Sequence, residues 1–352
     1  MRPLHAWLLL AGATLAVTMV AGCGGDDSPS ATPTSPPSSP TVAATATTAA
    51  PPTDLVAVKK SPASMSATDA AWSSAKVTTI KTTQVKTTAS TAPVEVKAQA
   101  LYSDTDVWFR FEWADPTKTT ARDWVYDGTK WKAPSGQQDR LALAWELTPS
   151  SDFQSKGCAA LCHNPETEKN NTWYMVSPSG VTMDFWQWTA GISNGMKQFS
   201  DYTLSNKVPD PTALGAPFVA DPNTGGGNVA NTNDAKDGPS KMQDPSKAPS
   251  MGTDYLLVTE AVALDVSKLK AGDKIPNALL APFTGSRGDI DAQGAWANGT
   301  WTVVAHRKLD TGNADDAKFA VGGSYPFGLA VFNDLGNVDH TVTTDVYILR
   351  LK

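Results

Sequence analysis

Apolar and polar residues alternate with a period of two in several short segments, which is the pattern of half-buried β-strands. In residues 107–113, Arg110 and Glu112 fall on one face, and the other face carries Val107, Phe109, Phe111 and Trp113. No segment has a sustained helical period, although residues 66–75 suit a short helix. Gly, Pro and Asp turns separate the apolar runs, so the chain is predicted to be all-β, an antiparallel sandwich. Further strands are predicted at residues 141–147, 255–264, 301–307, 328–332 and 346–351.

The first 22 residues have the layout of a bacterial export signal. Arg2 precedes an apolar run over residues 6–20, which is too short to favour a transmembrane helix, and small residues stand just before Cys23. The sequence Val-Ala-Gly-Cys ending at Cys23 resembles the lipobox of bacterial lipoproteins. This resemblance implies cleavage before Cys23, lipidation of that cysteine, and an exported protein anchored to a membrane on its extracytoplasmic side. The alternative is an ordinary secretory signal in which Cys23 is incidental.

Two low-complexity stretches lie beyond the signal. Residues 28–53 are Ser, Thr, Pro or Ala except for Val42, so residues 23–54 are predicted to be a disordered tether that begins at the lipidated cysteine. Residues 206–252 are rich in Pro, Gly, Asn, Asp and Lys and predict a long surface insertion. The insertion interrupts residues 55–352, which are enough for one large domain or two small ones.

The charge and the residue types exclude some functions. The net charge is −6, and loss of Arg2 with the signal would change it to −7. Nucleic-acid binding requires clustered Lys and Arg, so we expect no nucleic-acid partner, whereas a basic protein partner is compatible. No Ser-His-Asp arrangement, phosphate-binding loop or carboxylate pair indicates catalysis, and four histidines are few for acid–base chemistry. We therefore expect a protein that is not an enzyme.

Cys158, Cys162 and His163 form a C-x3-C-H cluster. Covalent haem attachment needs two thiols that reach the vinyl groups and a histidine that ligates the iron, with the usual spacing C-x-x-C-H. The extra residue lowers the specificity of the motif. A disulfide, which an exported protein can form, has no need of the adjacent histidine, and a zinc site would want four ligands. The cluster favours one covalent haem c, with a disulfide, a metal site or free thiols as alternatives.

The chain has twelve tryptophans, and three of them, Trp173, Trp186 and Trp188, lie near the cysteine cluster. Buried tryptophan usually indicates core packing. Large flat side chains also suit the walls of a pocket for a planar macrocycle, so these three are candidate haem contacts as well as candidate core residues.

From about residue 55 to the C-terminus, the chain resembles the haem-binding domain of ethylbenzene dehydrogenase and dimethylsulfide dehydrogenase gamma subunits. The resemblance implies a β-sandwich whose long loops enclose one haem, electron transfer as its role, and a place beside a molybdenum enzyme and an iron–sulfur protein. Six ordered motifs carry it, at residues 102–116, 139–145, 184–190, 285–290, 301–310 and 327–333.

The resemblance also suggests axial ligands for the haem iron. Members of that family with non-covalent haem b use a Met and a Lys. Met175 fits the place of the Met, with Met183 as the less favoured alternative, and His340 stands where the Lys is expected. We expect His163 and His340 to be the axial pair, with Met175 near the haem or substituting for one of them. His306 is interpreted as a structural or surface residue.

The sequence therefore predicts a lipid-anchored c-type cytochrome that passes electrons through one haem to redox partner proteins, of which a molybdenum oxidoreductase complex is one candidate. The alternative is a lipoprotein sandwich without haem that binds carbohydrate or another extracellular ligand, with a Cys158–Cys162 disulfide. Arg287-Gly-Asp289 is predicted to support a turn.

Overall fold

The computed structural model describes residues 53–84, 92–120, 122–157, 180–205, 218–334 and 340–352. All of them belong to one unit, residues 48–352. Cys23, Cys158, Cys162, His163, Trp173 and Met175 lie outside the described residues, as does the predicted tether up to residue 52. Within the described ranges, no helix has the length and apolar character needed to span a membrane.

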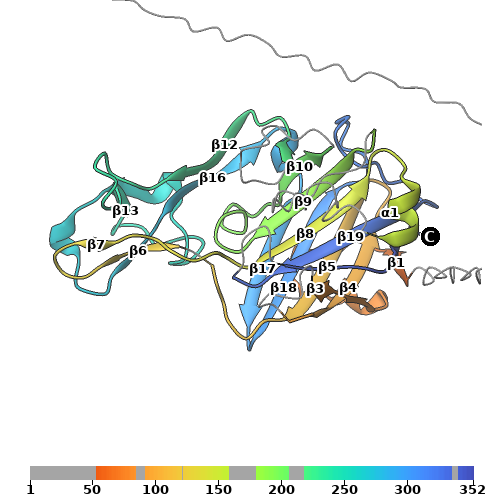
Figure 1. Cartoon of the computed structure of the whole chain (residues 1–352), viewed down its shortest axis with the longest axis horizontal. Helices are drawn as coiled ribbons and strands as arrows, with labels where there is room; N and C mark the ends of the chain where they lie inside the picture. The colour runs from red at the N-terminus through yellow and green to blue at the C-terminus, as the bar shows by residue number, and fades with distance from the viewer. Residues whose placement is uncertain (1–52, 85–91, 121, 158–179, 206–217, 335–339) are drawn as a thin grey trace, which may run out of the picture. The chain divides into compact units, whose positions relative to one another are not determined.

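Most strands belong to two sheets that share strand β1 (Thr53–Lys59) (Figure 1). Residues 53–57 of β1 pair in parallel with one sheet and residues 58–59 with the other. Beyond β1, sheet A contains β21 (Tyr347–Leu351), β19 (Ser324–Phe332), β8 (Arg140–Glu146), β9 (Met183–Thr189), β10 (Ser200–Leu204) and β11 (Phe218–Ala220) in that order. Sheet B contains β4 (Glu95–Tyr102), β5 (Asp106–Ala114), β18 (Thr300–Lys308) and β17 (Asp291–Ala297).

Short strands extend both sheets. In sheet B, β2 (Thr78–Lys81) pairs with β4. In sheet A, β20 (Thr341–Val342) pairs with β19 and with β3 (Thr83–Gln84). Apart from the two pairings of β1, the strands that make up these sheets pair antiparallel.

The main core lies between the two sheets and is rich in aromatic rings. Trp113 of β5 packs edge-on against Trp188 of β9 at a centroid distance of 6.1 Å, and Trp188 packs against Trp301 of β18 at 5.0 Å. On β5 burial alternates at every residue, because Val107, Phe109, Phe111 and Trp113 face this core. Arg110 and Glu112 form an ion pair at 2.7 Å on the other face. The predicted all-β sandwich is confirmed.

Other predicted elements agree in part. The strands predicted at residues 107–113, 141–147, 301–307, 328–332 and 346–351 correspond to β5, β8, β18, β19 and β21. The strand predicted at residues 255–264 is wrong, because residues 255–256 are irregular and Leu257 makes a single bridge to Leu280. The 3-10 helix η3 (Val258–Glu260) and the short β14 (Ala261–Ala263) follow. Within the predicted helix at residues 66–75 there is a 3-10 helix, η1 (Ala70–Ser74), whose first turn is capped by Asp69.

A six-residue helix, α1 (Ser151–Lys156), is absent from the sequence prediction. It follows β8 and begins at Ser150, whose hydroxyl accepts a hydrogen bond from the amide of Phe153 at 3.3 Å. Gly157 ends the helix with a positive φ of 73°. Six residues are too few to display a helical period, so only the capping serine signals the helix in the sequence.

The stretch predicted as a surface insertion contributes strands of its own. Its described part includes β11, β12 (Gly225–Ala230) and β13 (Lys241–Gln243). Strand β12 pairs with β16 (Ala278–Thr284), and β13 pairs with β14. A small sheet consists of β6 (Asp123–Tyr126), β7 (Trp131–Lys132) and β15 (Lys274–Pro276). Trp124 and Ile275 of this sheet form a separate apolar cluster with Leu256. The 3-10 helices η4 (Val266–Lys268) and η5 (Ser286–Gly288) complete the described elements.

Candidate functional site

The face of sheet A that points away from the core carries a second apolar cluster, called the outer face below. It forms because side chains alternate along each strand, so that on β9 Trp186 and Trp188 enter the core while Met183 and Phe185 project the other way. Phe153 of α1 packs into the same cluster. The other buried members are Ala142 and Ala144 of β8, Leu204 of β10, Ala330 and Phe332 of β19, and Val342 of β20.

His340 lies at this outer face. It stands immediately before β20, and its imidazole stacks on the ring of Phe332 with centroids 4.6 Å apart and an interplanar angle of 26°. Only 4% of the residue is exposed. The residue that the family resemblance singles out as an iron ligand is therefore a buried imidazole beside an apolar surface.

The described elements on either side of the cysteine segment, α1 and β9, both contribute residues to the same face. On one side, α1 packs through Phe153, and Cys158 follows Gly157 directly in the chain. On the other side, residue 180 leads into β9, whose first residue, Met183, is buried in the outer face. The roles predicted for Cys158, Cys162 and His163 stay predictions.

Met183 and His340 are too far apart to bind one iron together. Met183 pairs with Glu146 in the register of β8 and β9, whereas Arg140 of β8 pairs with both Thr189 and Phe332. Met183 and Thr189 are six residues apart on β9, which corresponds to roughly 20 Å at about 3.3 Å per residue. Axial ligands of one haem lie within a few ångström of each other across the iron, so Met183 cannot be the partner of His340.

Trp186 and Trp188 are core residues in this structure. Trp186 packs against Phe109 and Trp145 with centroids 6.0 and 5.2 Å away, and the indole nitrogen of Trp188 donates to Asn194 at 3.2 Å. Both are fully buried on the side of sheet A opposite His340. The core interpretation accounts for their burial, and contact with a haem stays a prediction for them.

The outer face offers other residues that the sequence did not single out. Ala142, Ala144 and Ala330 give the sheet a floor of small side chains, with the rings of Phe185 and Phe332 beside it. The sequence signal for this surface is alanine at alternate positions of β8, which is easily taken for ordinary core packing.

Positive charge lies at the end of the outer face where Phe332 and His340 meet. The guanidinium carbon of Arg140 is 5.8 Å from the centroid of Phe332, and one nitrogen donates to Gln137 at 2.9 Å. Burial lowers the pKa of Arg140 from its ordinary value, and the nearby charge of Arg122 lowers it further. Arg140 thus places positive charge beside an apolar surface with a histidine, and Arg122 is close enough to act on that charge.

Asp139 fixes the chain at this end of the face. One of its oxygens accepts hydrogen bonds from the Thr119 amide at 2.7 Å and the Trp301 indole at 3.0 Å, and the other accepts from the Asp334 amide at 3.1 Å. The carboxyl group is fully buried, and this burial raises its pKa to about 6. Asp139 therefore holds the start of β8 to the turn that follows β19.

His306 makes contacts that fit its interpretation as a structural residue. It lies on β18, its ring stacks on Trp108 at 4.9 Å, and its two nitrogens contact carboxylates of Asp291 and Asp106 at 3.0 and 3.1 Å. Burial lowers the pKa of His306, but the two carboxylates outweigh this effect and raise it above the ordinary value. His306 is part of sheet B and does not contribute to the outer face of sheet A.

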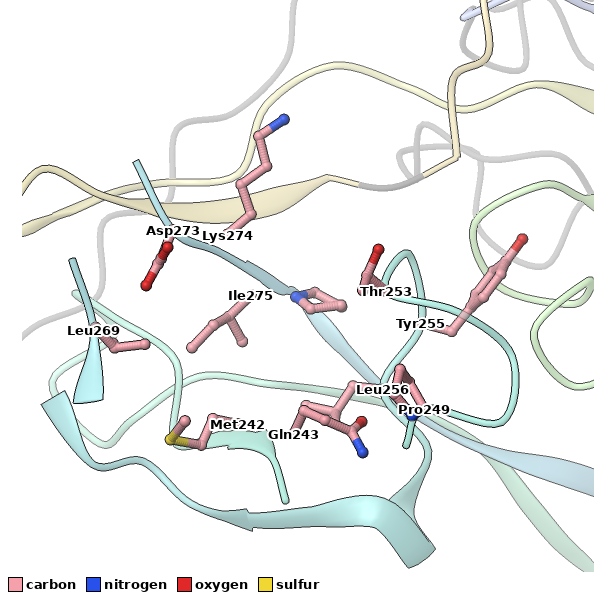
Figure 2. A pocket seen from close by; sticks show the side chains of 11 residues that line it. Met242, Gln243, Pro249, Thr253, Tyr255, Leu256, Leu269, Asp273, Lys274 and Ile275 are labelled. Carbon is pink, nitrogen blue, oxygen red and sulfur yellow. The ribbon is translucent and has the colours of Figure 1, made fainter. Parts of the chain in front are cut away.

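A separate pocket lies among the small sheets (Figure 2). Its volume is about 200 Å³, and its lining includes Met242, Leu256 and Ile275. Pockets for drug-sized ligands usually hold about 300–1,000 Å³, so this one is too small for a haem. Its lining also contains neither His nor Cys.

Comparison with known proteins gives one informative result for the sequence. A family model described as ethylbenzene dehydrogenase matches residues 69–343. No curated protein matches the chain.

Solved structures that match the chain include carbohydrate-binding proteins. One is a family 9 carbohydrate-binding module from Caldicellulosiruptor kristjanssonii in complex with glucose, at 9% identity over 85% of this chain and 95% of that chain, with a TM-score of 0.33. Another is a putative carbohydrate-binding protein from Bacteroides uniformis, at 6% identity over 85% of this chain and 99% of that chain, with a TM-score of 0.35. At such TM-scores the likeness carries no argument about function.

Proposed function

Because this chain belongs to the ethylbenzene dehydrogenase family, we propose that it serves an oxidoreductase as a non-catalytic protein that transfers electrons through one covalently bound haem c. The family match fits a subunit of an oxidoreductase. The C-x3-C-H cluster supports covalent attachment through Cys158 and Cys162. The observation that carries the proposal is the buried imidazole of His340, which stacks on Phe332 at the apolar outer face.

The residues of the outer face fit a haem by their chemistry. A buried histidine is a common ligand of haem iron, and aromatic and small apolar side chains suit the faces of a porphyrin. Arg140 and Arg122 would pair with the acidic propionate groups, because guanidinium groups bind carboxylates well. When bound, the haem supplies the change between Fe(III) and Fe(II).

Each side chain has a defined task in this proposal. His340 and His163 would hold the iron, and Phe332 would fix the orientation of the His340 ring by stacking on it. Phe185, Ala142 and Ala330 would keep water away from the porphyrin. Two histidine ligands generally give a lower reduction potential than a histidine and a methionine, so the protein would act as a comparatively low-potential carrier.

We further propose that lipidation at Cys23 anchors the protein outside the cytoplasm. The tether of residues 23–54 would keep the haem domain close to membrane oxidoreductases and raise its effective concentration there. Redox partner proteins, among them a molybdenum oxidoreductase complex, are the partners that this arrangement suits.

The proposal is tested on the full chain made together with cytochrome c maturation machinery. We expect a red protein whose Soret band stays with the polypeptide after acid–acetone extraction, and loss of that retention in the double variant Cys158→Ala/Cys162→Ala. A colourless protein, with a Cys158–Cys162 disulfide found by mass spectrometry, would overturn the haem proposal and favour the binding module without haem.

The assignment of His340 is tested separately. In His340→Ala we expect loss of the low-spin spectrum and its restoration by added imidazole, which can occupy the vacated position. The matched control is His306→Ala, because His306 lies in sheet B and should leave the spectrum unchanged. Circular dichroism checks that both variants fold. An unchanged low-spin spectrum in folded His340→Ala would remove His340 as a ligand and leave the covalent haem in place.

A further inference from the structure

A cluster of buried carboxylates lies on the core side of sheet A, opposite the outer face. Asp184 of β9 and Asp201 of β10 are fully buried, and Asp316, in the loop after β18, is 3% exposed. Each offers one oxygen, and these oxygens all lie within 4.8 Å of one another. Three strands or loops that are distant in sequence therefore bring negative charge to one point.

Each of these carboxylates has one oxygen that is hydrogen-bonded and one that is not. Asp184 accepts from Arg307 at 3.1 Å and from the Ala317 amide at 2.8 Å, both through Oδ2. The Oδ1 atom of Asp201 accepts from the Tyr202 amide at 2.9 Å. Asp316 accepts through Oδ2 from Thr311 and from Asn313, the latter at 3.2 Å. The second oxygen of each carboxylate is buried and has no hydrogen-bond donor.

A fourth carboxylate provides an independent sign that a ligand is missing. Asp221 is 3% exposed, and its Oδ1 accepts from the Thr203 hydroxyl at 2.8 Å. Its Oδ2 is buried without a donor. Burial raises the pKa of Asp221 to about 7. Its backbone amide donates to the backbone oxygen of Asp201 at 3.3 Å, which places Asp221 beside the cluster. Asp221 thus adds a fourth buried carboxylate beside the cluster of three.

The charges around this region do not balance. Asp289, next to Asp316, adds a fifth carboxylate, and Asp315 adds a further negative charge near Asp221. Among the residues that the structure describes, Arg307 is the cation with an ion pair to the cluster. Arg287 donates to the backbone oxygen of Asp201 at 3.1 Å and stacks on Tyr202, so it pairs with no carboxylate there. Buried charge without a partner is costly, and a bound cation would remove that cost.

We propose that Asp184, Asp201 and Asp316, with Asp221 as a further ligand, form a binding site for Ca²⁺. Calcium takes six to eight oxygen ligands at about 2.3–2.6 Å, so two oxygens on one ion are at most about 5 Å apart. The oxygens of Asp184, Asp201 and Asp316 meet this limit. Zinc prefers nitrogen and sulfur ligands, and magnesium usually keeps several waters, which suits a buried carboxylate cage less well. The ion would join β9, β10 and the loop that contains Asp316.

The competing explanation is a proton shared between adjacent carboxyl groups, for which Asp184 and Asp201 are placed. The full-length wild-type protein distinguishes the two. We expect calcium in its metal analysis after purification without chelator. We also expect unfolding in EDTA to occur about 5 °C below unfolding in CaCl₂ at a hundred times the dissociation constant. A protein without metal whose melting temperature is the same in EDTA and CaCl₂ would overturn the proposal.

Variants locate the ion. In Asp201→Asn we expect loss of the calcium-dependent shift, and the control Asp104→Asn, which changes an exposed carboxylate paired with Lys59, should keep it. A shared proton predicts the reverse: Asp201→Asn would be more stable than the wild type in EDTA, and neither protein would respond to calcium. If Asp201→Asn fails to fold, Asp316→Asn takes its place, and retention of the full calcium shift there would overturn the proposed site.

Discussion

The contact between Gly294 and Trp188 gives a sharp test of how the sandwich core is packed. A Cβ atom added to Gly294 of β17 would lie 2.3 Å from Cζ2 of Trp188 and 2.9 Å from Oδ1 of Asn194. The indole cannot easily retreat, because it is packed against Trp113 and Trp301 on its other sides. Glycine is required here because the ring lies directly on the backbone of β17.

We expect Gly294→Ala to lower the free energy of unfolding by about 3 kcal/mol, at the upper end of the range for overpacked cores. Trp188→Phe removes the atom that clashes and should cost about 2 kcal/mol by itself. Loss of the hydrogen bond from Trp188 to Asn194 adds little to this cost, because Oδ1 of Asn194 still accepts from the Gly294 amide at 2.8 Å. In the double variant the smaller ring leaves room for the methyl group. The combined loss should therefore fall short of the sum by at least about 1 kcal/mol.

Urea unfolding followed by circular dichroism measures these values. Ala295→Ser on the exposed side of the same strand is the control and should stay within about 0.5 kcal/mol of the wild type. Additive losses in the double variant, or a Gly294→Ala protein as stable as the control, would refute the packing described here. The haem content of folded Trp188→Phe adds a second result: unchanged content identifies Trp188 as a core residue, and reduced content as a haem contact.

Three further predictions concern charge and anchoring. The raised pKa of His306 means that its contact with Asp291 stabilises the fold fully below the unfolded pKa of about 6.5 and is lost as the pH rises through the folded value. The melting temperature of the wild type should therefore exceed that of His306→Gln by more at pH 5.5 than at pH 8.5, and an equal difference would contradict this. Arg307→Met leaves Asp184 without its ion pair and should cost about 3–5 kcal/mol in urea unfolding, so a loss below about 1 kcal/mol would show that the pair matters little. Cys23→Ser should move the protein from the membrane fraction to the soluble fraction on immunoblots, and an unchanged distribution would exclude lipidation at that residue.

The strands of the sandwich could be predicted wherever one face is buried and the other is wet. On β5 the alternation is complete, because Arg110 and Glu112 reach solvent while their neighbours fill the core. The run at residues 255–264 is apolar for a different reason. Leu256 belongs to the small cluster around Trp124, so this residue is buried although the run contains a 3-10 helix and no long strand. Hydropathy reports burial and does not say which sheet or cluster provides it.

The candidate site could be predicted only in part. Resemblance to a family identified His340, but its place on the outer face depends on the pairing of β20 with β19. The alternation that would reveal that face is hidden, since every residue of β9 is buried. The carboxylate cluster has no sequence signature either, because Asp184, Asp201 and Asp316 come together through strand pairing and a loop, without a fixed spacing.

Strand β9 explains how one protein can hold both proposed sites. Its residues alternate between the two sides of sheet A, so Phe185 lies in the outer face while its neighbour Asp184 joins the carboxylate cluster. Asp184 and Phe185 are consecutive in the chain, so the two environments lie on opposite sides of the sheet at neighbouring residues. Pairing of β9 with β8 and β10 fixes the positions of both side chains. A cation bound on the core side would fix β9 without placing charge in the apolar surface where a haem is proposed. The carboxylates and the apolar surface can therefore occupy opposite sides of the same strand, because successive side chains of β9 point to opposite sides of the sheet.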